Sequence, residues 1–341
     1  MTVQGRVEVG VVGLGYWGSN VARVFDALPD CELKWCCDVD LARAERSVAA
    51  FPSARLALDL DELLADPGLD AIAVATPVAT HATVAQRVLE AGKHCFVEKP
   101  LAQNTADADR LRALAEAGEK VLMAGHLLEY HPGVEALAEL VEGGGLGRIH
   151  YIYSQRLNLG KLRADENALW SLGAHDVSMV LALVGELPVE VSARGESYVR
   201  DGIEDVVFAH LRFRTGVTAR MHLSWLDPHK ERRLTVVGSK RMATFDDMAA
   251  HKLTVYDKGF DPDGASTGEY VARSGSARTP SISGEEPLRI ELGHFVDCVR
   301  NGRRPRSDGA SGVRVVQVLE ALQASLGAEG ATVEMAGSAA R

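Results

Sequence analysis

The stretch Val7–Gly18 reads VEVGVVGLGYWG, and it decides the fold of the first part of the chain. An apolar run, Val7–Val12, leads directly into Gly13, Gly15 and Gly18, and a helix-like stretch follows. The first glycine permits a tight turn, the second lets a pyrophosphate approach the backbone, and the third lets helix and strand pack closely. Phosphate oxygens would lie on the free N–H groups at the start of the helix. The pattern predicts a dinucleotide site formed by Gly13, Leu14, Gly15, Tyr16, Trp17 and Gly18.

Short apolar runs continue to alternate with helix-like stretches as far as residue 125. This alternation indicates βαβ units and a parallel sheet, and the nearly continuous apolar character of the runs fits strands buried on both faces. We therefore expect an α/β fold whose residues 1–125 form a doubly wound parallel sheet, a Rossmann domain. The further strands are expected at Leu33–Cys37, Ala71–Ala75, Cys95–Val97 and Val121–Ala124. The helices between them are expected at Leu41–Ala50, Ala82–Ala91 and Ala106–Ala117.

The pattern changes near residue 148, where runs of β-branched and aromatic residues follow one another. We expect residues 126–330 to form an α+β domain with an open, mostly antiparallel sheet. Its strands are expected at Ile149–Ser154, Val189–Ala193, Val206–Phe213, Val217–Trp225, Leu234–Val237 and Leu253–Tyr256. Its helices are expected at Gly173–Val184, Leu288–Arg300 and Val313–Leu326. Residues 259–287, rich in Gly, Ser and Pro, predict a long mobile loop, and residues 331–341 predict a flexible tail.

Composition excludes several classes of protein. The 341 residues carry a net charge of −10, which disfavours a nucleic-acid or anionic-membrane partner. No apolar run approaches the roughly 20 residues that span a bilayer, and the N-terminus lacks the pattern of a signal peptide. The five cysteines follow no disulfide or zinc spacing, which favours free thiols in a reducing cytosol. We expect a cytoplasmic protein.

Asp38 lies at the end of the second apolar run, about 20 residues after Gly18. A carboxylate there accepts hydrogen bonds from the adenosine ribose hydroxyls and repels a 2′-phosphate, which favours NAD over NADP. The alternative is that Asp38 only caps a loop. Thr76 and Pro77 follow the run Ala71–Ala75 and are placed to line the cofactor. His81 is either a further cofactor contact or a residue that caps or packs the next helix.

Glu98-Lys99-Pro100 follows the run Cys95–Val97 at the same edge of the predicted sheet. A lysine between an apolar strand and a proline suits proton transfer, because burial lowers its pKa toward neutrality. A cis peptide bond before Pro100 would fix the direction of the lysine. The alternative is a surface salt bridge between Glu98 and Lys99. Both residues are also expected beside the cofactor.

These motifs, together with Gly125-His126 and Asn301-Gly302, resemble the glucose-fructose oxidoreductase / inositol dehydrogenase / MocA family. They follow the family's order and cover nearly the whole chain. The resemblance implies hydride transfer between a bound nicotinamide and a carbinol carbon of a sugar or cyclitol. It implies that Lys99 contacts the reacting hydroxyl. It also implies a homodimer or homotetramer assembled through the face of the second domain's sheet.

The resemblance further implies that His175 is the second catalytic residue and handles the proton with Lys99. Many family members carry an aspartate four residues before this histidine, whereas this chain has Ser171. The difference weakens an Asp-His relay like that of inositol dehydrogenases. The alternative for His175 is a histidine that is satisfied within the core.

The segment Tyr151–Asn167 is unusually polar, and it is similar to the same stretch of family members that oxidise C3 of UDP-N-acetylglucosamine-type sugars. Its cationic groups could hold a nucleotide diphosphate or a hexuronate carboxylate, or the segment could be a solvated strand edge. The polar residues are Arg156, Asn158, Lys161, Arg163 and Asn167. His126 and Tyr130 are further candidates for substrate contact. No known metal-ligand spacing is present around them, so we expect no metal.

The sequence thus predicts an NAD-dependent sugar dehydrogenase or ketoreductase that acts on C3 of a nucleotide-activated hexose, such as UDP-N-acetylglucosamine or its uronate. An inositol or free-sugar dehydrogenase is the alternative among enzymes. A cofactor-binding sensor or regulatory protein without turnover is the alternative of another class, because a fold does not imply a function.

Overall fold

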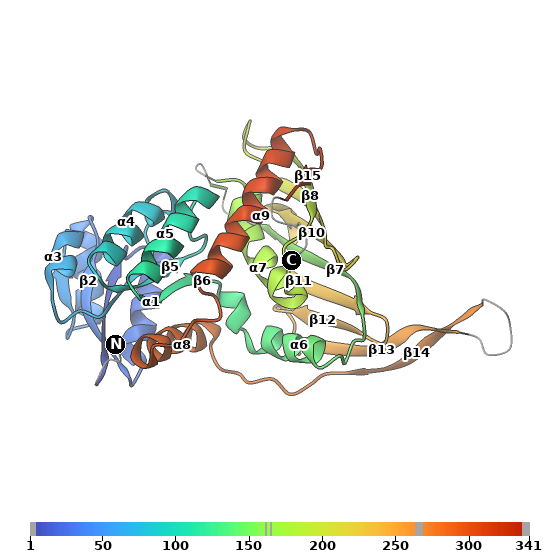
Figure 1. Cartoon of the computed structure of the whole chain (residues 1–341), viewed down its shortest axis with the longest axis horizontal. Coiled ribbons are helices and arrows are strands. Elements are labelled where there is room, and N and C mark those ends of the chain that lie inside the picture. Colours follow the sequence, from blue (N-terminus) through green and yellow to red (C-terminus); the bar gives the residue numbers. More distant parts are fainter. Residues whose placement is uncertain (1–4, 161, 164–165, 263–268, 336–341) are drawn as a thin grey trace. The chain divides into compact units, whose positions relative to one another are not determined.

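The computed structural model describes residues 5–160, 162–163, 166–262 and 269–335 (Figure 1). The chain divides into two compact units, and each is made of two segments. The first unit consists of Met1–Tyr130 and Glu285–Gln317, and the second of His131–Gly284 and Val318–Arg341. The sequence predicts a single boundary at residue 125. The structure differs because the helix α8 (Pro287–Asn301) packs Phe295 into the core of the first unit, between Phe25 and Phe96.

The first unit contains a six-stranded sheet in which every pairing is parallel. The strand order is β3-β2-β1-β4-β5-β6, so the order reverses between β1 and β4. The strands are β1 (Val7–Val12), β2 (Cys31–Cys37), β3 (Arg55–Ala57), β4 (Ala71–Val74), β5 (His94–Glu98) and β6 (Leu122–Gly125). This is the doubly wound sheet that the sequence predicts, and its switch point is where such folds bind ligands.

Helices cover this sheet, and α1 packs against α8 whereas α4 packs against α5. Asn104 caps the start of α5, since its side chain accepts a hydrogen bond from the backbone N–H of Asp107. The helices are α1 (Tyr16–Ala27), α2 (Leu41–Ala50), α3 (Leu60–Ala65), α4 (Val78–Glu90), α5 (Thr105–Ala117), the 3₁₀ turn η1 (Leu127–Tyr130) and α8.

The second unit contains a nine-stranded mixed sheet in the order β14-β13-β12-β11-β7-β10-β9-β8-β15. Only the pairing of β7 with β10 is parallel among the described residues, so the prediction of an open, mostly antiparallel sheet is confirmed. The strands are β7 (Ile149–Leu159), β8 (Glu190–Glu196), β9 (Val206–Arg212), β10 (Thr218–Ser224), β11 (Leu226–Gly238), β12 (Met242–Asp246), β13 (Leu253–Pro262), β14 (Tyr270–Arg278) and β15 (Val333–Glu334).

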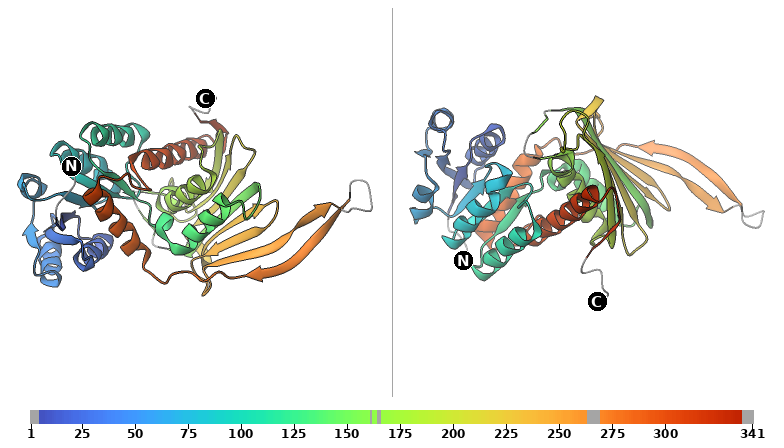
Figure 2. Two further views of the ribbon diagram at one scale, coloured as in Figure 1. Left: turned by 60° about the horizontal axis from the view of Figure 1, so that its bottom comes forward. Right: turned by 90° about the horizontal axis from the view of Figure 1, so that it is seen from above.

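Helices cover one face of the nine-stranded sheet (Figure 2). They are α6 (Pro132–Glu142), α7 (Ala174–Val184) and the end of α9 (Gly309–Gly327), within which the unit boundary falls. Ile152, Ala219 and Ala209 point to this face and are buried. We call the opposite face the outer face. Tyr153 and Arg220 lie side by side on it, because side chains alternate along each strand.

Two expectations about irregular chain are wrong. Residues 259–262 and 270–278 of the predicted mobile loop belong to the paired strands β13 and β14, and residues 263–268 lie outside the described residues. The composition misleads because Arg273 holds this hairpin together by ion pairs with Asp257 and Asp261, so few apolar side chains are needed. Val333–Glu334 of the predicted tail pairs with β8, whereas residues 336–341 lie outside the described residues.

All five cysteines are free and buried, as the sequence predicts. No helix among the described residues is long and apolar enough to cross a membrane.

Candidate active site

The glycine-rich loop between β1 and α1 leaves one backbone surface open. Gly13 has a φ of +87°, and a Cβ there would lie 2.7 Å from the carbonyl oxygen of Ala75. A Cβ on Gly18 would lie 1.8 Å from the carbonyl oxygen of Gly13, so neither position admits a side chain. A Cβ on Gly15 would meet nothing within 4 Å. No side chain caps the start of α1, so its first N–H groups are available to a phosphate, and the loop fits a pyrophosphate.

Asp38 follows β2 and lies, buried, beside this loop. Its Oδ2 accepts a hydrogen bond of 2.7 Å from the N–H of Leu14, and its Oδ1 accepts one of 2.9 Å from the N–H of Asp40. Arg43 Nε donates a third hydrogen bond, of 3.3 Å, to Oδ1. The carboxylate is therefore held in a fixed direction at the carboxyl end of β2, as a ribose-binding acid requires.

Apolar side chains lie exposed around the glycine-rich loop and Asp38. The exposed fraction is 89% for Tyr16, 88% for Val39 and 50% for Leu41. Exposed apolar residues that gather at one place indicate a binding surface. Here they fit the flat adenine and ribose rings of a dinucleotide, so the residues present fit the cofactor that the loop implies.

His81 joins the ends of two neighbouring strands. Its Nε2 lies 2.9 Å from the carbonyl oxygen of Thr76, after β4, and its Nδ1 lies 2.8 Å from the carbonyl oxygen of Pro100, after β5. The ring is buried, and burial lowers its pKa. A neutral imidazole has one N–H group and can donate to only one of the two carbonyls at a time. His81 therefore packs between two loops, which fits the second of the two roles left open for it, and contact with the cofactor stays a prediction.

Glu98 is the last residue of β5, and its carboxylate connects two parts of the site. The indole N–H of Trp17, in α1, donates a hydrogen bond to Glu98 Oε1. The backbone N–H of Lys99 donates a hydrogen bond of 3.2 Å to Glu98 Oε2. Burial raises the pKa of Glu98 to about 7, while Trp17 and Lys99 oppose that shift. Lys99 itself is half-buried, and its peptide bond to Pro100 is cis.

A second buried carboxyl group lies near Glu98. Glu291, in α8, is fully buried, and neither carboxylate oxygen has a hydrogen-bond partner among the described residues. Burial raises its pKa well above the ordinary value, and the charges of Glu98 and Glu129 add to that shift. His126 is also fully buried, and burial together with the charge of Lys99 lowers its pKa to about 4. Glu98, Glu291 and His126 are thus three buried titratable groups of the first unit, and Glu98 is the last residue of β5.

Tyr130 was expected to contact the substrate, but its side chain is fully buried and already makes a hydrogen bond within the protein. Its hydroxyl lies 3.0 Å from Ser307 Oγ, and the guanidinium of Arg306 lies 4.9 Å from its ring centroid. These contacts fix the chain after η1 within the first unit and leave no atom of Tyr130 for a substrate. His126, which is equally buried, has no exposed surface for a substrate either.

In the second unit His175 lies in the first turn of α7, directly after a π-helical turn at Leu169–Gly173. Such turns are frequent at functional sites. Asn167 holds this turn in place: its Oδ1 accepts a hydrogen bond from the N–H of Trp170, and its Nδ2 donates to Glu204 and to Gln323. The next residue, Asp176, is buried and forms an ion pair of 2.5 Å with Arg156 Nε.

Arg156 therefore corrects a second prediction. It lies on the helix-covered face of β7, buried, with Asp176 as its partner, and it supports the helix that carries His175. Arg163 is exposed and forms an ion pair of 2.9 Å with Glu166. Asn158 is half-buried, and its Oδ1 has no hydrogen-bond partner among the described residues. Arg163 and Asn158 remain candidates for substrate contact, whereas Lys161 lies outside the described residues.

The part of the chain that the structure describes contains no cluster of three or more side chains that could hold a metal ion.

Comparison with known proteins agrees with this geometry. Residues 7–126 match the model of an oxidoreductase family with an NAD-binding Rossmann fold, and residues 134–244 match the GFO/IDH/MocA C-terminal domain. The chain is 30% identical over 331 residues to UDP-N-acetylglucosamine 3-dehydrogenase of Acidithiobacillus ferrooxidans, covering 94% of this chain and 99% of that enzyme. The chain belongs to the GFO/IDH/MocA oxidoreductase family.

Solved structures of family members superpose over almost the whole chain. The Acidithiobacillus enzyme, GnnA, has a TM-score of 0.83 at 27% identity and covers 96% of this chain and 99% of its own. GenD2 from gentamicin A biosynthesis, solved in complex with NAD, has a TM-score of 0.82 at 28% identity and covers 97% of both chains. Myo-inositol 2-dehydrogenase of Thermotoga maritima is 25% identical over 90% of this chain and 92% of that enzyme.

Sequence reasoning missed three features of this GFO/IDH/MocA oxidoreductase. Trp17 was expected only beside the cofactor, and nothing in the sequence pairs it with Glu98, which lies far along the chain. The pairing of Arg156 with Asp176 also joins distant segments. Glu291 could have been noticed, because it interrupts the apolar stripe Leu288, Leu292 and Phe295 of a predicted helix. A glutamate in that stripe must be buried.

Proposed function

We propose that the chain is an NAD-dependent dehydrogenase that oxidises the C3 hydroxyl of a nucleotide-activated hexose, or reduces the corresponding ketone. The observation that carries the proposal is the hydrogen bond from Trp17 to Glu98. It joins the helix that begins at the glycine-rich loop to the end of the strand that presents Lys99. A proton-transfer residue is thereby fixed relative to the dinucleotide loop, as dehydrogenation requires.

When bound, the nicotinamide accepts the hydride that leaves the carbinol carbon. Lys99 Nζ accepts the proton of the same hydroxyl, so that the oxygen becomes a carbonyl oxygen as the hydride departs. Buried Glu98 beside Lys99 places a carboxyl group next to the lysine in a region of low dielectric, where the ionisation of one affects the other. His175 hydrogen-bonds the reacting oxygen or its neighbour and passes the proton on.

NAD rather than NADP is proposed as the cofactor. The Asp38 carboxylate is fixed by Leu14, Asp40 and Arg43 in a direction that suits two ribose hydroxyls. A 2′-phosphate would meet this carboxylate at close range, which costs binding energy. Glu98, Thr76 and Pro77 are proposed to line the nicotinamide side, since they follow β4 and β5 at the carboxyl edge of the sheet.

The proposed substrate class follows from the relatives and from two side chains. The Acidithiobacillus relative is named for the 3-dehydrogenation of UDP-N-acetylglucosamine, and this chain matches 99% of its length. Arg163 offers an exposed guanidinium for a diphosphate or a carboxylate, and Asn158 Oδ1 is an acceptor without a hydrogen-bond partner among the described residues. A cyclitol is the alternative substrate, because another relative is named myo-inositol 2-dehydrogenase.

We also propose a homodimer or homotetramer assembled through the outer face of the nine-stranded sheet. Tyr151, Tyr153 and Phe208 are exposed on this face, and the Tyr151 and Tyr153 rings stack at 6.2 Å. Exposed aromatic residues on an uncovered sheet face are characteristic of protein–protein interfaces.

The test is a substrate panel. Purified protein is mixed with NAD⁺ and, separately, UDP-N-acetylglucosamine, its uronate, UDP-glucose, glucose and myo-inositol, and absorbance of the reduced cofactor is followed. We expect reduction with a UDP-sugar and a loss of about 10²–10⁴-fold in kcat for Lys99→Ala. Lys230→Ala, an exposed lysine, is the matched control. Normal turnover by Lys99→Ala would contradict the mechanism, and reduction with polyols alone would favour the cyclitol dehydrogenase. Cofactor binding without turnover in either direction would favour a sensor.

A further inference from the structure

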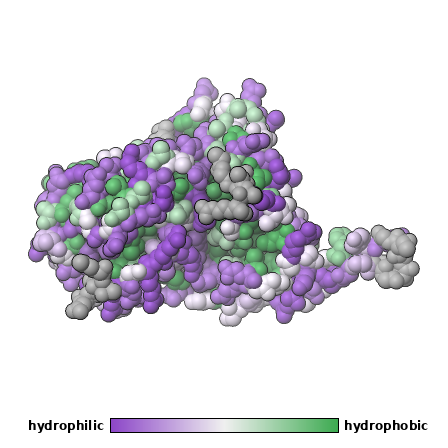
Figure 3. All heavy atoms as spheres, viewed as in Figure 1, coloured by the Kyte–Doolittle hydropathy of each residue, from purple (hydrophilic) through white to green (hydrophobic). Residues whose placement is uncertain are grey.

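The β13–β14 hairpin extends beyond the rest of the second unit (Figures 1 and 3). β13 pairs with β12 only from Leu253 to Tyr256. From Lys258 to Pro262 its partner is β14 alone, over Tyr270–Ser274. We call these two paired segments the arm. A two-stranded ribbon by itself is marginally stable in water, so an arm of this kind gains from a surface to lie on.

The two faces of the arm differ in chemistry. Phe260 pairs with Ala272, and Pro262 pairs with Tyr270, so these side chains share one face, which we call the aromatic face. The other face carries Arg273, which forms ion pairs with Asp257 at 3.2 Å and Asp261 at 2.5 Å. The charged groups of this face are thus paired, and Arg273 Nη2 also donates a hydrogen bond to the carbonyl oxygen of Lys240. The aromatic face is uncovered, and Phe260 and Tyr270 are each 67% exposed.

The aromatic face of the arm continues the outer face of the sheet. Side chains alternate along β13, so Phe260 lies on the same side as Tyr256. Tyr256 pairs with Met242, and Val237 pairs with both Met242 and Tyr151 of the outer face. The outer face therefore continues from Tyr151 to the arm, and Val237 is buried along this path.

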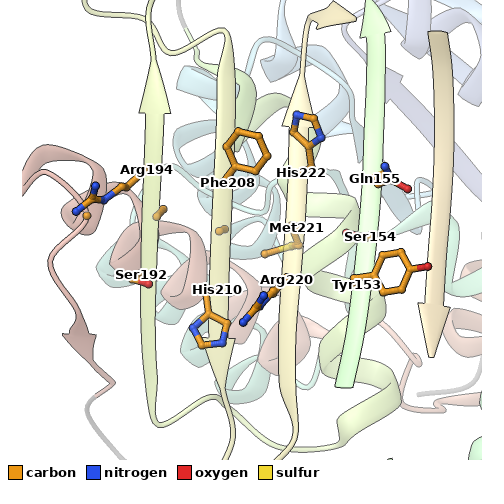
Figure 4. Close-up of a pocket in the computed structure, with 13 residues that line it drawn as sticks. Tyr153, Ser154, Gln155, Ser192, Arg194, Phe208, His210, Arg220, Met221 and His222 are labelled. Carbon is orange, nitrogen blue, oxygen red and sulfur yellow. The ribbon is translucent and has the colours of Figure 1, made fainter. Parts of the chain in front are cut away.

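A hollow of about 550 Å³ lies on the outer face, across β7, β8, β9 and β10 (Figure 4). The side chains that line it include two arginines, Arg194 and Arg220, and three rings, those of Phe208, His210 and His222. The Phe208 and His222 rings stack at 4.2 Å. Within the described part of the chain neither Arg194 nor Arg220 has an ion-pair partner. The hollow therefore presents two guanidinium groups, whereas the net charge of the chain is −10.

We propose that the arm of one copy packs its aromatic face into this hollow on a second copy, and that the second copy reciprocates. The arm brings Phe260 and Tyr270, which match Phe208 in the hollow. It also brings Glu269, an exposed acid next to Tyr270 that complements Arg194 and Arg220. A contact in which each copy gives one arm and receives one is self-complementary and closes as a symmetric pair. The inference rests on the proposed assembly through the outer face and adds the arm and its docking site.

Sedimentation equilibrium of the full-length protein tests the proposal. Phe260→Ser/Tyr270→Ser in the arm and Arg220→Glu in the hollow should each raise the dissociation constant of the assembly at least tenfold. Val271→Ser is the matched control, because Val271 is 57% exposed but lies on the opposite face of the arm. Its dissociation constant should equal that of the wild type. Adding Glu269→Arg to Arg220→Glu should restore association, since the charges are exchanged. Circular dichroism confirms that each variant is folded.

Disulfide trapping gives an independent readout. All native cysteines are buried, so Tyr270→Cys combined with His222→Cys should yield a covalently linked pair of chains on mild oxidation, and Val271→Cys with His222→Cys should not. Undiminished association of both the arm and the hollow variants would overturn the arm proposal and leave the assembly through the sheet intact. A monomeric wild type would overturn both. Binding of inorganic pyrophosphate to the hollow of an assembled wild type, abolished by Arg220→Glu, would assign the hollow to an anion instead.

Discussion

The indole N–H of Trp17 donates a hydrogen bond to the carboxylate of Glu98. The first residue lies in the opening turn of α1, at the glycine-rich loop, and the second ends β5, next to Lys99. A buried carboxyl group has few ways to satisfy its oxygens, so this bond is costly to remove. The hydrogen bond therefore holds the start of α1, at the dinucleotide-binding loop, in a fixed position relative to the end of β5, which precedes Lys99.

Replacing Trp17 by Phe should raise the pKa of Glu98, because the hydrogen bond from Trp17 lowers it and burial, which raises it, remains. If ionised Glu98 supports Lys99, the acid limb of the kcat/KM profile near pH 7 moves to higher pH in Trp17→Phe. The same limb should be absent in Glu98→Gln. The pH dependence of kcat/KM checks both. Trp35→Phe is the control, because Trp35 donates to Asp66 elsewhere in the same unit, and a limb that moves equally in that variant would refute the link.

Glu98 should also make stability depend on pH. Its pKa is about 7 in the folded protein against an ordinary value of 4.5, so the folded state binds the proton more tightly. The stabilisation by the protonated carboxyl group is complete below pH 4.5 and is lost as pH rises through 7. The difference corresponds to about 3 kcal/mol. Urea unfolding from pH 5 to pH 8 should show a steeper loss for the wild type than for Glu98→Gln. Parallel curves would exclude the effect.

The pair of Arg156 and Asp176 should be needed for stability rather than for substrate binding. Arg156→Met leaves a buried carboxylate without its partner, which costs about 3–5 kcal/mol of unfolding free energy. Arg156→Met/Asp176→Leu should recover most of that loss. Arg163→Met, at an exposed pair, should cost less than about 1 kcal/mol. Chemical denaturation measures all three. If the Arg156→Met protein had normal stability and a raised KM for the substrate, the structural role would be wrong and Arg156 would be a substrate-binding residue.

Asp38→Asn should weaken the preference for NAD. Loss of the charge removes charge-assisted hydrogen bonds to the ribose, worth roughly 1.5–3 kcal/mol, or about 10- to 100-fold in the KM for NAD⁺. Arg43, which contacts Asp38, becomes available to a 2′-phosphate, so the KM for NADP⁺ should fall. Steady-state kinetics with both cofactors give the ratio. Asp40→Asn is the control, since Asp40 caps α2 and also contacts Arg43, and it should leave that ratio unchanged.

The first unit was predictable in outline because its signals are local. The glycine spacing and the buried strands each depend on residues near one another in sequence, and the parallel sheet that they predict is confirmed. β3 was missed because it has only three residues, and α6 was also missed. The arm was mistaken for a loop because ion pairs across strands leave no apolar periodicity to read.

The sequence indicated which residues belong to the candidate site, but not which residues they contact. Lys99, Asp38 and the glycines stand where the motif places them, at the carboxyl edge of the sheet. The partners were not predictable, because a hydrogen bond such as that of His81 with Pro100 depends on how two βα loops face each other. Polar residue types alone also suggested that Arg156 and Tyr130 meet the substrate. Burial gives both a structural role, and burial is a property of the folded chain.

The return of Glu285–Gln317 to the first unit has a consequence for biosynthesis. The ribosome makes Val7 to Tyr130 first, yet the core that surrounds Phe25 and Phe96 lacks Phe295 until residues 131–284 of the second unit have been synthesised. The first unit therefore cannot complete its core before the long strands of the second unit have been made. A chain that terminates before α8 lacks Phe295 and cannot form the complete core of the first unit.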